Sequence, residues 1–252
     1  MFGFATKLQR LGGDFGITQL VVGICVALYA FTLIYDLSAI RGGGLLGMLS
    51  PGIEALFRFG ASGWAPVLQL GRWWTVLSAG WLHGGLLHIF FNAMWLRQLL
   101  PVTAAIYGTG RSLTLLVVSS AIGFLTSTGM GYITARSGSG LLDSLMGSGQ
   151  VTVGASAAIF GLLGAVVYAG RRGIASSLGR TMWQYAIALF VLSAFIPRVD
   201  NWAHLGGFVG GYLVARWMDP FKPERTDQLL TGLVLLVVSL LSVVWSFFTP
   251  LS

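Results

Sequence analysis

The sequence predicts an all-α protein, a polytopic bundle of about seven transmembrane helices. Of its 252 residues, 55% are hydrophobic and only 9% are charged, whereas about a quarter of the residues in a soluble domain carry charge. Apolar runs of about 20 residues, the length that crosses a bilayer as a helix, follow one another along the chain. The 36 glycines are spread through these runs, which is typical of helices that pack closely in lipid.

The composition also argues against several classes of protein. Seven helices occupy most of the chain and leave no room for a second soluble domain. The single cysteine, Cys25, lies in the first apolar run, so a disulfide framework and cysteine-based metal motifs are excluded. The net charge of +7 comes from basic residues that separate the apolar segments. We therefore expect these residues to set membrane topology and not to bind nucleic acid.

The first transmembrane helix is expected at 17–37, after a short N-terminal segment at 1–16. This run is too long for the core of a signal peptide and lacks a small-residue cleavage site, so we expect it to be retained. Residues 41–72 form a connection that is too polar to span the membrane. Its amphipathic piece at 53–59 is expected to lie at the membrane interface.

Six further helices are expected along the rest of the chain. They lie at about 83–104, 112–133, 155–170, 181–196, 202–218 and 229–248. The Gly- and Ser-rich stretch 134–150 is expected to be a loop. It should fold over the start of the short fourth helix, which would then lie below the membrane surface. Residues 17–218 thus form a six-helix core, followed by a linker and seventh helix at 219–252.

The basic residues predict the orientation of the bundle. One side collects Lys7, Arg10, Arg111, Arg171, Arg172, Arg180, Arg216, Lys222 and Arg225. The other side has Arg41, Arg58, Arg72, Arg136 and Arg198, spread over longer loops. The positive-inside rule therefore places the N-terminus in the cytoplasm and the C-terminus outside. The short tails and the lack of a transit peptide favour a bacterial inner membrane.

Polar residues of three helices share one predicted depth. The second, fourth and sixth helices all run inward, so their N-terminal ends lie together in the outer leaflet. The polar residues at these ends are His83, His88, Asn92, Ser156 and His204. Ionisable side chains in a span are costly and usually mark a function. We therefore expect a functional site in the outer leaflet.

Ser156 and His204 are the expected catalytic pair. A serine hydroxyl attacks a carbonyl when a neighbouring base takes its proton, and histidine is the usual base. Gly207 and Gly211 give the sixth helix a face of small residues just beyond His204. On the fourth helix the small residues are Gly154, Ala157, Gly161 and Gly164. Such faces let two backbones approach closely, although they also occur in helix bundles without catalytic sites.

His88 and Asn92 are four residues apart and share one face of the second helix. Together with the backbone N–H of Ser156, near a helix N-terminus, they can stabilise the oxyanion of a tetrahedral intermediate. The alternative is a polar pair that joins two helices. His83 is expected to have a structural role, either a buried hydrogen bond near loop 41–72 or the holding of a water molecule.

A metal site made of the three histidines is the competing chemical interpretation. His83 and His88 lack i, i+4 spacing and no carboxylate or cysteine lies nearby in either histidine segment, so we expect neither a metal nor a cofactor. Asp200 precedes His204 by four residues and can orient it. Capping of the sixth helix by Asp200 or Asn201 is the more usual role, so we expect a Ser/His dyad. The soluble G-x-S-x-G nucleophile elbow does not fit, because the context is helical and the second glycine is missing.

Three segments resemble the signature segments of the rhomboid family of intramembrane serine proteases. They are GASAAIFG on the fourth helix, HGGLLHIFFN on the second and AHLGGFVGG on the sixth. The resemblance implies that Ser156 is the nucleophile, His204 the general base, and His88 and Asn92 the side-chain oxyanion donors. It also implies a six-helix core with a C-terminal seventh helix, and a transmembrane substrate that is unwound near its outer end.

The chain departs from the family pattern at two positions. Many members carry Arg directly after a Trp in the first loop, whereas here Trp74 is followed by Thr75. Phe160 stands where some members have a Tyr against the catalytic histidine. The expected function is nevertheless a serine endopeptidase that cleaves transmembrane proteins in the bilayer near the outer leaflet, with the fifth helix as lateral gate.

Two alternatives belong to other classes of protein. A rhomboid-like pseudoprotease would bind transmembrane segments without cutting them, but such relatives typically lack the serine or the histidine. A small transporter with a histidine proton relay would show paired halves, and the sequence has no such internal symmetry.

Overall fold

The computed structural model describes residues 2–37, 47–138, 140–147 and 149–251. These residues form an all-α bundle, as predicted, and an isolated β-bridge joins Ser62 and Thr152. The α-helices in chain order are α1 (Phe2–Tyr35), α2 (Ile53–Phe59), α3 (Thr75–Ser78), α4 (Leu86–Tyr107), α5 (Thr109–Ser137), α6 (Gly140–Met146), α7 (Ser156–Arg171), α8 (Ser176–Ser193), α9 (Asn201–Ala215) and α10 (Thr226–Phe248).

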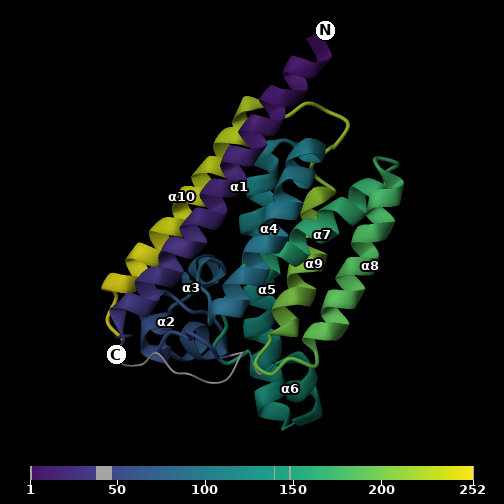
Figure 1. Cartoon of the computed structure of the whole chain (residues 1–252). Coiled ribbons are helices and arrows are strands. Elements are labelled where there is room, and N and C mark those ends of the chain that lie inside the picture. Colours follow the sequence, from purple (N-terminus) through teal and green to yellow (C-terminus); the bar gives the residue numbers. More distant parts are fainter. Residues whose placement is uncertain (1, 38–46, 139, 148, 252) are drawn as a thin grey trace.

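Helix α7 is the central element of the bundle (Figure 1). It packs against α4, α5, α8 and α9, and all of its residues from Ala157 to Ala169 are buried. Helix α10 packs on α5 and α1 packs on α4, on the flank opposite α8. The N- and C-termini lie at opposite ends of the bundle (Figure 1).

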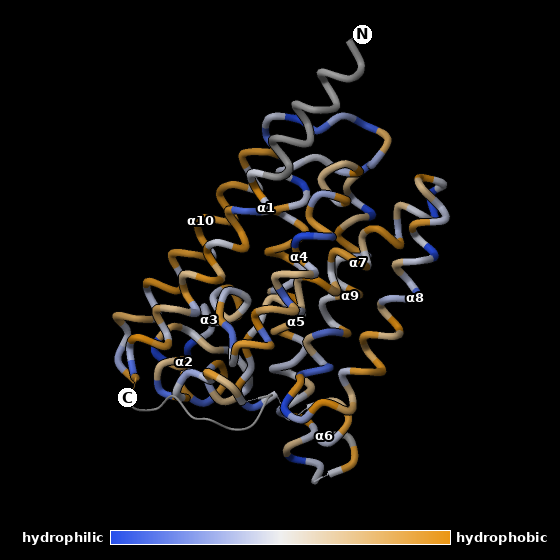
Figure 2. Tube along the Cα trace, in the orientation of Figure 1, coloured by the Kyte–Doolittle hydropathy of each residue, from blue (hydrophilic) through white to orange (hydrophobic). Residues whose placement is uncertain are grey.

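In the described part of the chain, four segments are long and apolar enough to cross a membrane. They are Gly16–Tyr35, Leu86–Tyr107, Thr109–Ser137 and Thr226–Phe248. Exposed apolar side chains cover the outward faces of α10 and of the C-terminal half of α8. Figure 2 shows the hydrophobic residues of these segments in orange. Because soluble monomers rarely expose apolar patches of this extent, these faces indicate contact with lipid. The chain is an integral membrane protein.

The predicted helices are present, with shifted ends. Helix α1 begins at Phe2, so the predicted N-terminal segment 1–16 is helical from that residue onward. Helix α2 has the predicted bounds. Helix α4 begins at Leu86, because Gly85 adopts an extended conformation (φ 167°, ψ 169°) just before it. His83 therefore lies ahead of the helix and not in its first turn.

The prediction of an irregular loop at 134–150 was wrong. Helix α5 continues to Ser137 and α6 occupies Gly140–Met146. The Gly and Ser content of this stretch suggested a loop, but α6 has the sequence GLLDSLM, in which leucine and methionine favour a helix. Helix α6 packs against α5 and α9.

Glycines bring α7 and α9 into backbone contact. A Cβ atom on Gly207 would lie 2.2 Å from the carbonyl oxygen of Ala157, and one on Gly211 would lie 2.0 Å from that of Gly161. Real Cβ atoms do not approach other atoms so closely, so only glycine fits these positions. The small-residue faces predicted on these two helices therefore meet each other.

Helix α5 completes this centre, a role that the sequence did not indicate. A Cβ atom on its Gly123 would lie 2.6 Å from the carbonyl oxygen of Ala203 in α9. The Ser119 hydroxyl of α5 lies where a side chain on Gly161 of α7 would be. The three helices α5, α7 and α9 are therefore packed as one rigid unit.

Arg72 joins the first loop to the C-terminal helix. Its side chain is 2% exposed. The guanidinium donates hydrogen bonds to the carbonyl oxygen and hydroxyl of Ser246 (2.9 and 2.6 Å), and to the carbonyl oxygens of Pro250 and Phe57 (both 3.2 Å). The last carbonyls of a helix lack partners and carry partial negative charge, so a buried cation stabilises the end of α10. Arg72, two residues before Trp74, thus anchors the loop.

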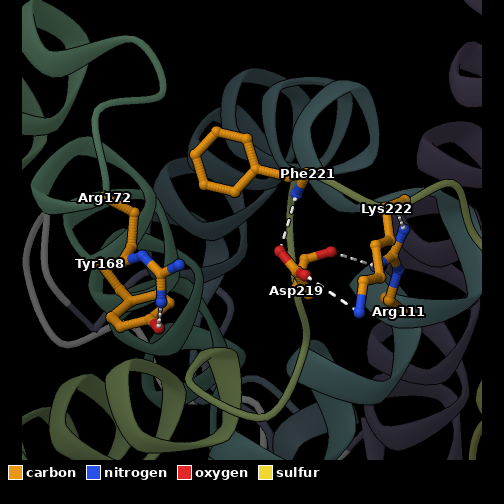
Figure 3. Close-up of polar contacts among 6 residues, drawn as sticks. All are labelled: Arg111, Tyr168, Arg172, Asp219, Phe221 and Lys222. Atoms are coloured by element: carbon orange, nitrogen blue, oxygen red, sulfur yellow. Dashed lines mark hydrogen bonds and ion pairs between the residues drawn. The ribbon is translucent and has the colours of Figure 1, made fainter.

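The linker between α9 and α10 is also fastened to the bundle. Arg111 is 3% exposed, and its guanidinium donates to the carbonyl oxygens of Asp219 and Lys222, both at 2.8 Å (Figure 3). Its backbone N–H donates to a carboxylate oxygen of Glu224 at 2.7 Å. These bonds hold the start of α10 against α5.

Replacing Arg72 by Gln should lower the free energy of unfolding by about 2–3 kcal/mol, because several buried carbonyl groups lose a charged donor. Thermal unfolding in detergent, followed by circular dichroism, measures the change. Lys222→Gln is the control, since Lys222 is an exposed cation whose ion pair with Asp219 contributes little. If the two variants unfold at the same temperature, Arg72 does not anchor α10.

Gly207→Ala should destabilise the bundle by about 2–3 kcal/mol, since the added methyl group forces α7 and α9 apart. This loss exceeds the gain of about 1 kcal/mol that alanine normally brings to a helix. Gly129→Ala in α5 is the matched control, because a Cβ atom there meets nothing within 4 Å. The same unfolding experiment compares the two, and equal stability would show that α7 and α9 tolerate a wider spacing.

Candidate active site

Ser156 is the first residue of α7, and its hydroxyl faces α9. Its Oγ lies 2.8 Å from Nε2 of His204, which is a hydrogen-bond distance. The surrounding residues Ala155, Ala157 and Ala158 are all buried. Because Ser156 begins the helix, its backbone N–H has no intrahelical acceptor and is available to a ligand.

His204 is buried in the first turn of α9, with an exposed fraction of 5%. Its Nδ1 lies 3.0 Å from Oδ1 of Asn201. An amide oxygen only accepts hydrogen bonds, so Nδ1 carries the ring proton and Nε2 is left to accept a proton from Ser156. The Phe160 ring stacks on the imidazole at a centroid distance of 4.4 Å and an angle of 14°. Stacking is therefore retained at this position without a tyrosine hydroxyl.

His88 approaches Ser156 from α4. The backbone N–H of Gly84 donates to its Nδ1 at 3.2 Å, so in the neutral ring the proton is on Nε2. A Cβ atom on Gly154 would lie 2.5 Å from that Nε2 and 3.7 Å from the Ser156 hydroxyl. Gly154 also has a φ of +130°, which favours glycine. The ring thus packs on the backbone directly before α7.

The segment before α7 is held by residues that lie between α1 and α4. Ser62 and Thr152 exchange two backbone hydrogen bonds, at 3.0 and 2.8 Å, and the Gly154 N–H donates to the carbonyl oxygen of Ala79 at 3.0 Å. These bonds fix the backbone that leads into Ser156.

Asn92 lies one turn after His88, on the same side of α4. It is 4% exposed and its Nδ2 donates to the carbonyl oxygen of His88 at 2.8 Å. The amide has a second N–H that this bond does not use.

His83 is fully buried, and neither of its ring nitrogens has a hydrogen-bond partner among the described residues. The predicted hydrogen bond near loop 41–72 is therefore not seen there. Its ring instead meets the ring of His88 edge-on, with centroids 5.2 Å apart.

Asp200 and Asn201 take different roles. The carboxylate of Asp200 accepts the Ala203 N–H at 3.0 Å, which caps α9, and also accepts the Ser127 hydroxyl. Desolvation raises the pKa of this carboxyl above its ordinary value, and these hydrogen bonds oppose the rise. Asn201 contacts His204, a role that the sequence had not predicted. The spacing i, i+3 on one helix face was the available signal.

The described residues contain no group of three or more His, Cys, Asp or Glu side chains placed to hold a metal ion. The groups close to Ser156 include the imidazole of His204, whose Nε2 can accept a proton, and the ring of His88, whose Nε2 carries one. This arrangement suits the attack of a hydroxyl on a carbonyl carbon.

The chain matches the family model of the Rhomboid domain over residues 70–221, which is more than half of its length. That range contains Ser156, His204, His88 and Asn92.

Relatives of this chain occur in bacteria, plants and an apicomplexan. Rhomboid protease GluP of Bacillus subtilis (strain 168) is 29% identical over 208 residues, which cover 81% of this chain and 36% of that protein. RHOMBOID-like protein 2 of Arabidopsis thaliana is 29% identical over 194 residues, or 71% of this chain and 55% of that protein. Rhomboid-like protease 5 of Toxoplasma gondii is 29% identical over 170 residues, which cover 65% of this chain and 18% of that protein. The chain thus spans about half or less of these relatives.

Proposed function

The chain belongs to the rhomboid family, and on that premise we propose that it is an intramembrane serine endopeptidase with a Ser156–His204 dyad. The observation that carries this proposal is the 2.8 Å contact between the Ser156 hydroxyl and Nε2 of His204. GluP, a relative over 81% of this chain, bears the name rhomboid protease.

In the proposed mechanism, Ser156 attacks the carbonyl carbon of a peptide bond. As the Oγ–C bond forms, the hydroxyl proton passes to Nε2 of His204 and the carbonyl oxygen becomes an oxyanion. When the intermediate collapses, the C–N bond breaks and His204 gives that proton to the leaving amine. A water molecule then hydrolyses the acyl-enzyme, again with His204 as base.

Three donors are proposed to stabilise the oxyanion. They are the Nε2–H of His88, the free amide N–H of Asn92 and the backbone N–H of Ser156. The Gly84 bond to Nδ1 of His88 supports this role, because it leaves a donor on the nitrogen near Ser156. Donors that are fixed before the reaction stabilise charge more strongly than mobile water does.

The proposed substrates are transmembrane proteins that reach the site from the lipid bilayer. A groove of about 350 Å³ lies between α4 and α8, lined by residues that include Trp95, Tyr185 and Leu192. The buried residues of α8 form one stripe, and most of its other residues are exposed. We propose α8, the predicted fifth transmembrane helix, as the lateral gate. A substrate helix must unwind at the site, since its backbone groups are otherwise paired with each other.

We further propose a catalytic core at 17–218, supported by the linker and α10 at 219–252. The termini at opposite ends of the bundle agree with an odd number of crossings (Figure 1). We propose that the N-terminus lies in the cytoplasm of a bacterial cell and that the site lies near the outer leaflet; the distribution of Lys and Arg supports this orientation.

Ser156→Ala and His204→Ala should each slow cleavage at least about 10³-fold, because one removes the nucleophile and the other its base. The measurement is cleavage of a transmembrane reporter that is co-reconstituted with the protein in liposomes. Ser177→Ala, at an exposed position on α8, should cleave at the wild-type rate. Cleavage that persists in either dyad variant would disprove the proposed mechanism.

His88→Ala should lower kcat by about 10²- to 10³-fold with little change in KM, because an oxyanion donor acts only in the transition state. Phe90→Leu, at a lipid-facing position on the same turn, is the control. If His88 only joins helices, its replacement will lower thermal stability while the folded fraction keeps the wild-type kcat.

A further inference from the structure

Ser193 is the last residue of α8 and points into the protein. The buried residues of α8 are Gly179, Met182, Ala186 and Ser193, which form a stripe along one side of the helix. Ser193 is the polar member of this stripe, and it is 8% exposed. The two residues before it in the chain, Val191 and Leu192, are exposed. A buried hydroxyl at the end of this helix requires a partner inside the protein.

That partner is the oxygen that also binds His204. The Ser193 hydroxyl donates to Oδ1 of Asn201 at 2.5 Å, with a second acceptor in the Phe190 carbonyl at 2.8 Å. The same Oδ1 accepts the Nδ1–H of His204 at 3.0 Å, and Ser193 Oγ lies 3.5 Å from that Nδ1. The Nδ2 of Asn201 donates to the carbonyl oxygen of Leu145 in α6 at 2.8 Å. Asn201 is 1% exposed and is held by both α6 and α8.

We propose that Asn201 is a positioning residue that holds His204 in its catalytic orientation, and that Ser193 makes this orientation depend on α8 lying against α9. This inference rests on the proposed function of the Ser156–His204 dyad. Asn201 acts through the histidine and does not contact the reacting atoms.

The chemistry of the amide explains the positioning. Because Oδ1 can only accept, it keeps the proton of neutral His204 on Nδ1 and leaves Nε2 free to receive the proton of Ser156. Without this acceptor the ring can take the other tautomer, in which Nε2 carries a proton and cannot act as a base. The amide therefore provides the orientation that a carboxylate provides in a Ser-His-Asp triad.

Ser193 links this orientation to the position of the gate. The start of α8 packs on α7 at Gly179 and Gly170, whose backbones touch: a Cβ atom on Gly179 would lie 2.7 Å from the Cα of Gly170. The opposite end of α8 is joined to the site through Ser193. If that end moves to admit a substrate, Ser193 leaves Asn201, and the amide loses one of its restraints. His204 then regains full activity only when α8 returns to its position against α9 and Ser193 again bonds to Asn201.

The test is a double-mutant cycle on the full chain, with kcat and KM measured for the transmembrane reporter in liposomes. Asn201→Ala should lower kcat by about 10- to 100-fold with KM nearly unchanged, as expected when a catalytic group is misplaced. Ser193→Ala should lower kcat by about 3- to 10-fold, which corresponds to one hydrogen bond. The double variant should be no slower than Asn201→Ala, because Ser193 acts through Asn201.

Two conservative variants separate positioning from a purely structural role. Asn201→Asp keeps an acceptor for His204 but loses the donor to Leu145, so it should recover most of the activity that Asn201→Ala loses. Ser193→Thr keeps the hydroxyl and should be close to wild type. The control is Thr181→Ala, which removes from the same helix a hydroxyl that bonds to the Ser177 carbonyl oxygen of α8 itself.

The outcomes distinguish this inference from the proposed function. A wild-type protein that does not cleave the reporter would overturn the proposed function and this inference with it. With an active wild type, an unchanged kcat in Asn201→Ala would overturn the positioning role alone. If Asn201→Asp is as slow as Asn201→Ala, Asn201 acts by holding α6 and the positioning role is wrong. Additive losses in the double variant would show that Ser193 does not act through Asn201.

Discussion

The backbone contact between α7 and α9 is the constraint on which the rest of the structure depends. Gly207 and Gly211 leave no space between α9 and the carbonyl groups of α7. Ser156 and His204 both lie in the first turn of their helices, at the same end of this contact. The glycines therefore set the 2.8 Å distance between the hydroxyl and the imidazole. A bond of this kind is sensitive to shifts of a few tenths of an ångström.

The surrounding helices shield α7 from lipid. Helix α7 is enclosed by α4, α5, α8 and α9, so a serine and a histidine can lie at membrane depth without exposure to hydrocarbon. Two buried arginines, Arg72 and Arg111, fasten α10 to the bundle near its two ends. In helix α8 the buried residues form one narrow stripe, and most of the others are exposed.

The central part of the fold and site could be predicted because it follows from local sequence and depth. Apolar run lengths locate the helices, and topology places Ser156, His204 and His88 at one level. The contacts made by loops could not be predicted in this way. Arg72 reaches carbonyl groups about 175 residues further along the chain, at Ser246 and Pro250. No periodicity indicates such a pairing.

Asn201 and Ser193 illustrate a second limit. An asparagine next to Asp200 at the start of a helix is a typical capping residue, and Asp200 does cap α9. Only the packing of α6 and α8 around Asn201 shows that its amide oxygen faces His204. Similarly, α6 appeared as a loop because its Gly and Ser neighbours outweighed a short run of helix-forming residues.

The central claim is that His204 activates Ser156 for attack. The most direct measurement is the covalent reaction of the purified protein with a fluorophosphonate, a probe for activated serines, with the modified residue identified by mass spectrometry. The account predicts one adduct, on Ser156, and a severe loss of this reaction in His204→Ala. Absence of an adduct on Ser156, or equally fast labelling without His204, would contradict it.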